Sequence, residues 1–409
     1  MTRNMLIGQS GGPTVAVNAS LAGAIKRAMK HSEINNIYGV CNGLEGLLNE
    51  RIIDLRPQFR NVRDFQALED TPAMALGSCR YKLPPQPHPV YGNILDIFHR
   101  YQIKYFFYIG GNDSMDTVMK LSDFFRECGE DIRCVGIPKT IDNDLPCTDH
   151  TPGFGSAARF IAFTVAEIAC DSTVYDMPSI SIVEIMGRNA GWLTASSALA
   201  RREGCTAPHL VYLPEEPFDT DKFIGKLLDL RKNIKHIVVA VSEGIRYEDG
   251  QYISAAGEKT DVFGHRALAG VGKYLEQLVS ERIGCKVRSV ELSVLQRSAT
   301  HLKSDTDILE ACRIGAEAVS FAVKGETGVM AVFRRVSDEP YLVSYECADL
   351  HSIANQEKKA PREWINEDGC DVTEKMLTYL NPLIVDQQGL GIPAFFTLNA
   401  DVNMVGGKK

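Results

Sequence analysis

The sequence has no long apolar run, no paired-cysteine motif and no excess of basic charge. No stretch of the 409-residue chain reaches the ~18 apolar residues of a spanning helix. The apolar run near Met1 is too short for a signal peptide, so neither membrane insertion nor export is expected. The 11 cysteines include no C-x-x-C pair, which indicates free thiols in a reducing cytoplasm rather than zinc or disulfides. A net charge of −8 argues against nucleic acid as a partner.

Familiar nucleotide-binding motifs are also missing. The chain contains no G-x-x-x-x-G-K-[ST] loop and no protein-kinase signature. Residues 153–158 mimic the dinucleotide pattern G-x-G-x-x-A, but the residues before them are polar and turn-forming. Because that pattern needs a preceding strand, we do not expect a nicotinamide site.

What is present is an alternation of strand-like and helix-like segments. Hydrophobic residues make up 44% of the chain, which is enough for a full core. Strands are expected at 5–8, 36–40, 105–109, 134–137, 179–185, 210–213, 236–241, 289–295, 329–334 and 341–346. Helices are expected at 15–29, 91–100, 115–128, 156–169, 190–200, 221–233 and 264–283, with mixed polar helices near the end. This rhythm predicts an α/β protein with mostly parallel sheets and helices on both faces.

We expect two Rossmann-like domains with the active site in the cleft between them. The first domain is predicted to comprise residues 1–150 together with about 298–345. The second is predicted to comprise residues 151–297 together with about 346–409. Open α/β sheets bind ligands at the carboxyl ends of their strands. Polar residues gather at such ends in this chain, which favours a ligand site there.

The segment P-K-T-I-D-N-D at 138–144 is the most informative of these strand ends. One of its carboxylates, Asp142 or Asp144, could take a hydroxyl proton while the other holds magnesium. Alternation would point both carboxylates to one side, but Asn143 makes a turn equally plausible. Lys139 suits an anionic ligand. Taken alone, the motif is also compatible with an Asx-rich turn and a solvated surface lysine.

Several motifs together resemble the phosphofructokinase family. They are S-G-G (10–12), G-S-C-R (77–80), G-G-N-D-S (110–114), P-K-T-I-D-N-D (138–144), E-I-M-G-R (184–188), S-E-G (242–244) and L-Q-R (295–297). Their order and spacing cover roughly residues 5–335. The resemblance implies phosphoryl transfer to the 1-hydroxyl of fructose 6-phosphate, with Mg²⁺ as cofactor.

The resemblance also implies a role for individual residues. The catalytic residues would be Asp142, Arg188, Lys139 and Asp113. Fructose 6-phosphate would be bound by Thr140, Ile141, Asp142, Met186, Gly187, Arg188, Glu243, Arg288, Leu295, Gln296 and Arg297. The phosphoryl donor would be bound by Gly12, Arg80, Gly111, Asn112, Asp113, Ser114 and Lys139, and Mg²⁺ by Asn112 and Asp144.

Two positions bear on the donor. Members of the family that use ATP usually have glycine where Lys139 and Asp113 stand, whereas members that use pyrophosphate are similar to this chain at both. Pyrophosphate lacks adenosine, so its binding relies on charge, and Lys139 supplies a cation. Asp113 would repel an α-phosphate. The sequence therefore predicts a reversible, pyrophosphate-dependent enzyme. The alternatives are an ATP-dependent member and an inactive sugar-phosphate-binding regulator.

The chain departs from the family pattern in four places. Asn112 replaces a metal-binding aspartate, and an amide oxygen is a weaker magnesium ligand. Ser179 stands where an arginine often makes a phosphate contact between subunits, and Val294 stands where histidine or tyrosine is common. Ala22 and Lys26 replace the arginines of allosteric members, so tight allosteric control is not expected. The resemblance suggests a homodimer or homotetramer.

Overall fold

A computed structural model describes residues 3–202, 204–253 and 270–385, and within them the strands form two sheets. The larger sheet contains β1 (Asn4–Gln9), β2 (Ile37–Val40), β3 (Ile52–Asp54), β4 (Ile103–Gly110), β5 (Arg133–Pro138), β10 (Val329–Asp338) and β11 (Tyr341–Asp349). The smaller sheet contains β6 (Ser179–Ile185), β7 (Leu210–Tyr212), β8 (His236–Ser242) and β9 (Lys286–Glu291).

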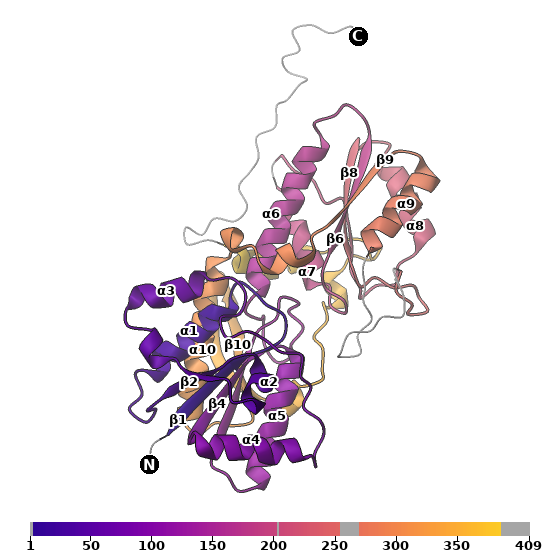
Figure 1. Cartoon of the computed structure of the whole chain (residues 1–409). Coiled ribbons are helices and arrows are strands. Elements are labelled where there is room, and N and C mark those ends of the chain that lie inside the picture. Colours follow the sequence, from indigo (N-terminus) through magenta and orange to yellow (C-terminus); the bar gives the residue numbers. More distant parts are fainter. Residues whose placement is uncertain (1–2, 203, 254–269, 386–409) are drawn as a thin grey trace.

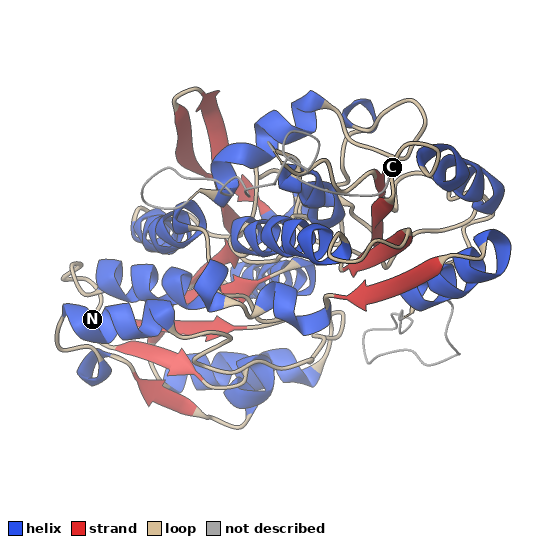
Figure 2. Cartoon of the chain, turned by 90° about the horizontal axis from the view of Figure 1, so that it is seen from above, coloured by secondary structure: helices blue, strands red, loops and turns tan. Residues whose placement is uncertain are grey.

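The helices alternate with these strands along the chain. They are α1 (Val17–Ala28), α2 (Gly43–Leu48), α3 (Val62–Asp70), α4 (Pro89–Arg100), α5 (Asn112–Glu127), α6 (Phe154–Ser172), α7 (Trp192–Ser196), α8 (Thr220–Leu230), α9 (Val271–Ile283), α10 (Asp305–Val323) and α11 (Glu374–Leu380). Figure 2 shows the helices lying on either side of the strands.

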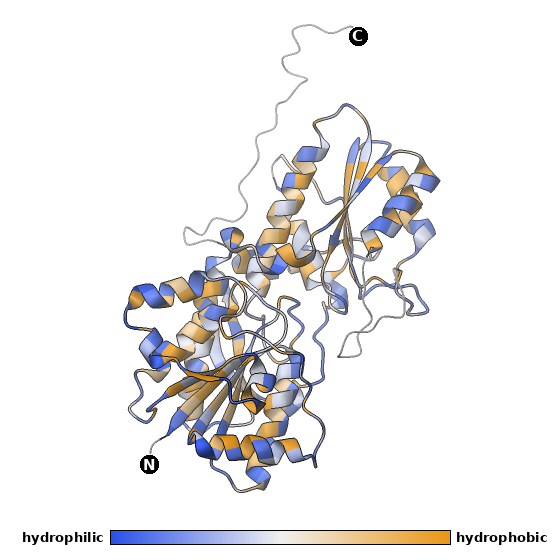
Figure 3. Cartoon of the chain, viewed as in Figure 1, coloured by the Kyte–Doolittle hydropathy of each residue, from blue (hydrophilic) through white to orange (hydrophobic). Residues whose placement is uncertain are grey.

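The larger sheet has the order β11-β10-β5-β4-β1-β2-β3. Its central strands are parallel, while β3 and β11 add antiparallel edges. Strand β4 shows why both faces need helices, because its side chains alternate between two cores. Phe106 and Tyr108 pack in one core with residues of α2, α4 and α5, and Phe107 packs in the other with residues of α1 and α10. Figure 3 shows the hydrophobic residues gathered along the strands.

The smaller sheet has the order β7-β8-β6-β9, and all its pairings are parallel. Strand β6 divides its side chains in the same way. Val183 packs in a core shared with α6, α7 and α11, and Ile182 in a core shared with α8 and α9. The fold class expected from the sequence, mostly parallel sheets covered on both faces, is confirmed.

The chain returns to its first sheet near the end, as the orange strand β10 lying among purple elements shows in Figure 1. Strand β10 pairs with β5, and α10 packs against α1. This strand pairing supports the prediction that residues of the segment at about 298–345 pack with the first domain. The full division of the chain into two domains stays a prediction. None of the described helices is both long and apolar enough to cross a bilayer.

Three expected elements differ from the structure. The strand expected at 289–295 is β9, which ends at Glu291; Ser293, with a left-handed φ of 44°, turns the chain into the 3₁₀ helix Ser293–Arg297. The helix expected at 190–200 is the short α7 followed by a 3₁₀ turn, Ser197–Ala200. The helix expected at 264–283 begins at Val271 as α9, and its first six expected residues lie outside the described residues.

Candidate active site

A cleft of about 1050 Å³ is lined by residues that follow strands of both sheets. From the side of the larger sheet it is lined by Gly12, Arg80, Gly111, Asn112, Asp113, Ser114, Lys139, Thr140, Ile141, Asp142 and Asp144. From the side of the smaller sheet it is lined by Met186, Arg188, Glu243 and Arg297. The structure therefore brings together most of the residues that the sequence predicted.

Lys139 follows β5 and is almost completely buried, with 2% of its surface exposed. Its Nζ donates a hydrogen bond to the carbonyl oxygen of Gly12, 2.5 Å away. Burial lowers the pKa of Lys139 to about 7, against the opposing effect of Asp142, and Arg297 lowers it further. A cation that has lost its water in this way gains most from binding an anion, because the anion restores the interactions that burial removed.

Asp142 and Asp144 flank Asn143, whose left-handed φ of 54° makes this segment a turn. Of the two backbone shapes considered for this motif, an alternating strand and a turn, the structure shows the turn. Burial raises the pKa of both carboxyl groups, and Glu243 raises that of Asp142 further. The nearby guanidinium of Arg188 acts in the opposite direction on Asp142. A carboxylate with a raised pKa is a better proton acceptor, as a general base requires.

The wall of the cleft on the side of the smaller sheet is built from three motifs that hydrogen-bond to one another. The N–H of Met186 donates to Oε1 of Gln296 at 3.1 Å, and the N–H of Gly187 donates to Oε1 of Glu243 at 3.3 Å. Ser242 Oγ donates to the carbonyl oxygen of Gly187 at 2.6 Å. Gly187 has a φ of +123°, which only glycine adopts readily. Bonds between residues that lie 55, 56 and 110 positions apart thus hold one loop in place.

Two residues predicted to bind the sugar do not line the cleft. Gln296 is 2% exposed and acts on the loop at Met186 rather than facing the cavity. Leu295 is 58% exposed and does not line the cleft.

Arg288 requires a correction. It was expected to flank a strand near the cleft, but it lies in the middle of β9, and its Nη1 is 2.9 Å from Oδ2 of Asp171. It lines a separate, small cavity with Asp171 and Ser179 and does not reach the cleft of its own chain. The reason is that β9 begins at Lys286, two residues before Arg288, so the arginine lies within the strand.

Asn112 is already hydrogen-bonded on both sides of its amide. Its Oδ1 accepts the N–H of Asn355 at 2.5 Å, and its Nδ2 donates to the carbonyl oxygen of Gln356. By contrast, Oδ1 of Asp144 is buried and has no hydrogen-bond partner among the described residues. Carboxylate oxygens are the ligands that Mg²⁺ prefers, so Asp144 fits a magnesium ion better than Asn112 does.

Sequence reasoning missed several residues of the cleft. Glu45, Lys82, Asn189, Asn355 and Glu357 also line it. The last two lie in a charged segment, N-Q-E-K-K, that follows no strand and reads as ordinary exposed surface. No local signal in the sequence distinguishes them.

A cleft at the carboxyl ends of parallel strands, with buried carboxylates beside lysine and arginine, is typical of an enzyme that transfers phosphoryl groups. The chain belongs to the phosphofructokinase family, whose model (Phosphofructokinase) matches residues 4–322. The resemblance stated from the motifs is confirmed.

Individual relatives agree over nearly the whole chain. A protein of Halomonas elongata named pyrophosphate–fructose 6-phosphate 1-phosphotransferase is 41% identical over 397 residues, which cover 96% of this chain and 93% of that protein. A crystal structure of pyrophosphate-dependent phosphofructokinase from Nitrosospira multiformis has a TM-score of 0.86 and 35% identity, covering 97% of this chain and 99% of the other. The corresponding structure from Marinobacter aquaeolei has a TM-score of 0.83 and 36% identity, covering 100% and 98%.

Proposed function

We propose that this chain transfers a phosphoryl group from pyrophosphate to the 1-hydroxyl of fructose 6-phosphate, forming fructose 1,6-bisphosphate and phosphate. Lys139 is the observation that carries the proposal, because a buried ammonium in the cleft suits a small, highly charged donor. The names of the relatives that match this chain over more than nine-tenths of its length support the same reaction.

In this reaction Asp142 acts as the general base. It accepts the proton of the 1-hydroxyl while that oxygen forms a bond to one phosphorus of pyrophosphate. The bond from that phosphorus to the bridging oxygen breaks, and phosphate leaves with the bond electrons. Arg188, also in the cleft, neutralises charge on the transferred group, and Lys139 neutralises charge on the donor. Since the leaving group is inorganic phosphate rather than ADP, the reaction is expected to lie near balance and to be reversible.

Asp144 is the residue proposed to hold Mg²⁺, directly or through water, because Oδ1 is buried and unpartnered among the described residues. When bound, the ion supplies positive charge to the phosphate oxygens. The neutral, doubly hydrogen-bonded amide of Asn112 supports this role less well.

Donor choice is proposed to follow from Lys139 and Asp113. Asp113 lies in the first turn of α5 and lines the cleft, so its charge opposes a longer polyphosphate chain. The test measures kcat/KM with pyrophosphate and with ATP. Faster turnover with pyrophosphate is expected, and a higher kcat/KM with ATP contradicts the proposal. Absence of any fructose 1,6-bisphosphate with either donor would indicate the inactive regulator instead.

A cytoplasmic homodimer or homotetramer completes the proposal. Within one chain Arg288 does not reach the cleft, so any contact with the sugar phosphate requires a neighbouring copy. Light scattering of the purified protein tests the assembly. A purely monomeric, fully active protein would remove Arg288 from the substrate site.

A further inference from the structure

Residues 355–358, here called the strap, lie beside the cleft and contact parts of the chain that are far apart in sequence. At one end the strap is held by the start of α5. The N–H of Asn355 donates to Oδ1 of Asn112 at 2.5 Å, and Nδ2 of Asn112 donates to the carbonyl oxygen of Gln356. Nδ2 of Asn355 also donates to Oδ1 of Asp116 at 2.9 Å. An amide can both accept and donate in this way, whereas a carboxylate can only accept.

At its other end the strap enters the catalytic turn through Lys358. Its Nζ donates to Oδ1 of Asn143 at 3.1 Å, to the carbonyl oxygen of Thr148 at 3.0 Å and to that of Asp149 at 2.7 Å. An ammonium group has three protons, so these bonds use its full donor capacity. The N–H of Lys358 donates to the carbonyl oxygen of Asp144 at 2.7 Å. The strap therefore holds the turn by both backbone and side chain.

The left-handed Asn143 at the centre of the turn has a second support from the same part of the chain. Its Nδ2 donates to the hydroxyl of Tyr379 at 2.8 Å, and that hydroxyl donates to the carbonyl oxygen of Asp149 at 2.7 Å. Asn143 is completely buried. The conformation that presents Asp142 and Asp144 to the cleft thus depends on groups more than 200 residues away.

The strap also contacts the sugar side. Oε1 of Glu357 accepts a hydrogen bond from Nδ2 of Asn189 at 2.8 Å, next to Arg188. Trp192, at the start of α7, donates from Nε1 to the carbonyl oxygen of Lys358 at 3.0 Å. The strap therefore connects α5, the catalytic turn and the loop after β6.

We propose that the strap positions the Asp142–Asp144 turn for phosphoryl transfer, with Lys358 as the positioning residue and Asn112 as the anchor of the strap rather than a magnesium ligand. The claim that the strap supports phosphoryl transfer rests on the proposed function, whereas the claim that it holds the turn in place does not. An asparagine is needed at position 112 because an aspartate could not donate to Gln356 and would place a negative charge against its carbonyl oxygen.

The test uses Asn112→Asp and Lys358→Met in the full chain, with Lys359→Met as the control that removes an exposed neighbouring charge. Hydrogen exchange of the ligand-free protein is followed in peptides covering 140–150 and 353–360. Lys358→Met loses charged hydrogen bonds, and Asn112→Asp loses a donor and places a charge against a carbonyl oxygen. Exchange at least about tenfold faster is therefore expected in both variants, with no change in the control. Unchanged exchange in Lys358→Met overturns the proposal.

Kinetics separate an anchor from a metal ligand. If Asn112 is the anchor, Asn112→Asp and Lys358→Met lower kcat about tenfold or more, while the KM for fructose 6-phosphate changes little. If Asn112→Asp instead keeps wild-type exchange and binds Mg²⁺ more tightly in calorimetric titration, Asn112 is a ligand and the anchor role is wrong. If the wild type has no activity, the proposed function fails, and the exchange data alone decide whether the strap holds the turn.

A third and milder variant, Asn355→Gly, keeps the test valid if the first two fail to fold. Asn355 has a φ of 61°, which glycine adopts without strain, so Asn355→Gly removes only the bond to Asp116. It is expected to fold and to speed exchange in 353–360 by a smaller factor than Asn112→Asp. No increase in that peptide also counts against the strap.

Discussion

The two ends of the cleft are built in different ways. At the proposed donor end, Lys139 and Asp113 line the cleft and follow separate strands, β5 and β4. At the proposed sugar end, Met186 and Gly187 are held by hydrogen bonds with the motifs at 242–243 and 296. Substitutions at the donor end should therefore change which anion binds, whereas substitutions at the sugar end should distort a shared geometry.

Removal of the proposed general base, Asp142, should have the largest effect. Asp142→Asn removes the proton acceptor, so kcat is expected to fall by ~10²–10⁴. The melting temperature should not fall, because the carboxylate is buried at a cost and its pKa is raised. Steady-state kinetics and calorimetry check this, with Asp96→Asn, an exposed carboxylate, as control. Near-normal kcat would mean that another group takes the proton.

The donor end should respond next. Lys139→Met removes the buried ammonium, and kcat/KM for pyrophosphate should fall by ~10²–10³, since losing one partner of a buried charge pair costs several kcal/mol. The KM for fructose 6-phosphate should change little. Lys82→Met removes an exposed cation of the same cleft, and a smaller effect is expected because water already solvates that charge. Equal losses in the two variants would show that burial of Lys139 is unimportant.

The sugar end should respond through geometry. In Gly187→Ala the new Cβ would lie 2.7 Å from the carbonyl oxygen of Ala190, at a φ that alanine rarely adopts. Strain of ~1–3 kcal/mol should raise the KM for fructose 6-phosphate about tenfold and leave the KM for pyrophosphate nearly unchanged. Gly225→Ala, in α8 with nothing within 4 Å, should be neutral or stabilising. A loss confined to pyrophosphate would contradict the division of the cleft.

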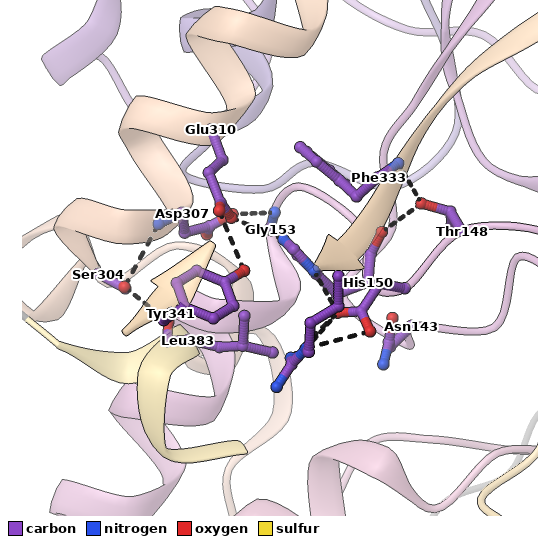
Figure 4. Close-up of polar contacts among 12 residues, drawn as sticks. Asn143, Thr148, His150, Gly153, Ser304, Asp307, Glu310, Phe333, Tyr341 and Leu383 are labelled. Atoms are coloured by element: carbon purple, nitrogen blue, oxygen red, sulfur yellow. Dashed lines mark hydrogen bonds and ion pairs between the residues drawn. The ribbon is translucent and has the colours of Figure 1, made fainter. Parts of the chain in front are cut away.

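A buried ionic cluster behind the catalytic turn should show the smallest effect. Figure 4 shows His150 with Glu310 and Tyr341. The other ring nitrogen of His150, Nδ1, lies 2.9 Å from Oδ2 of Asp149. Burial alone would lower the pKa of His150, but Glu310 and Asp149 outweigh it and raise the pKa to about 9. Because this folded-state pKa exceeds the ordinary 6.5, the stabilisation is complete below pH 6.5 and is lost as pH rises through about 9.

The melting temperature measured from pH 6 to pH 10 tests this expectation. At pH 6 the melting temperature of the wild type should be a few degrees higher than that of His150→Gln, at ~2–4 °C for each kcal/mol of stabilisation. The difference in melting temperature should shrink above pH 9. A difference that stays constant across this range would mean that His150 is neutral in the folded protein.

Much of the fold and the cleft could be predicted because they depend on local patterns. Runs such as 105–109 and 236–241 are apolar enough to be buried on both faces, which requires parallel strands between helices. Polar residues directly after those runs then fall at one edge of a sheet. Arg288 shows the limit of this reasoning, since β9 begins at Lys286 and pairs with β6, which places the arginine within the strand rather than beside it.

By itself, the sequence determined the α/β class, the family and the charged groups of the cleft, because hydrophobic periodicity and residue chemistry are properties of short segments. Only the tertiary structure decided that Asn112 hydrogen-bonds to the backbone of residues 355–356 and that Lys358 hydrogen-bonds to the Asp142–Asp144 turn. These bonds join residues more than 200 positions apart, and a hydrogen bond depends on where two groups meet in space, which no local pattern in the chain encodes.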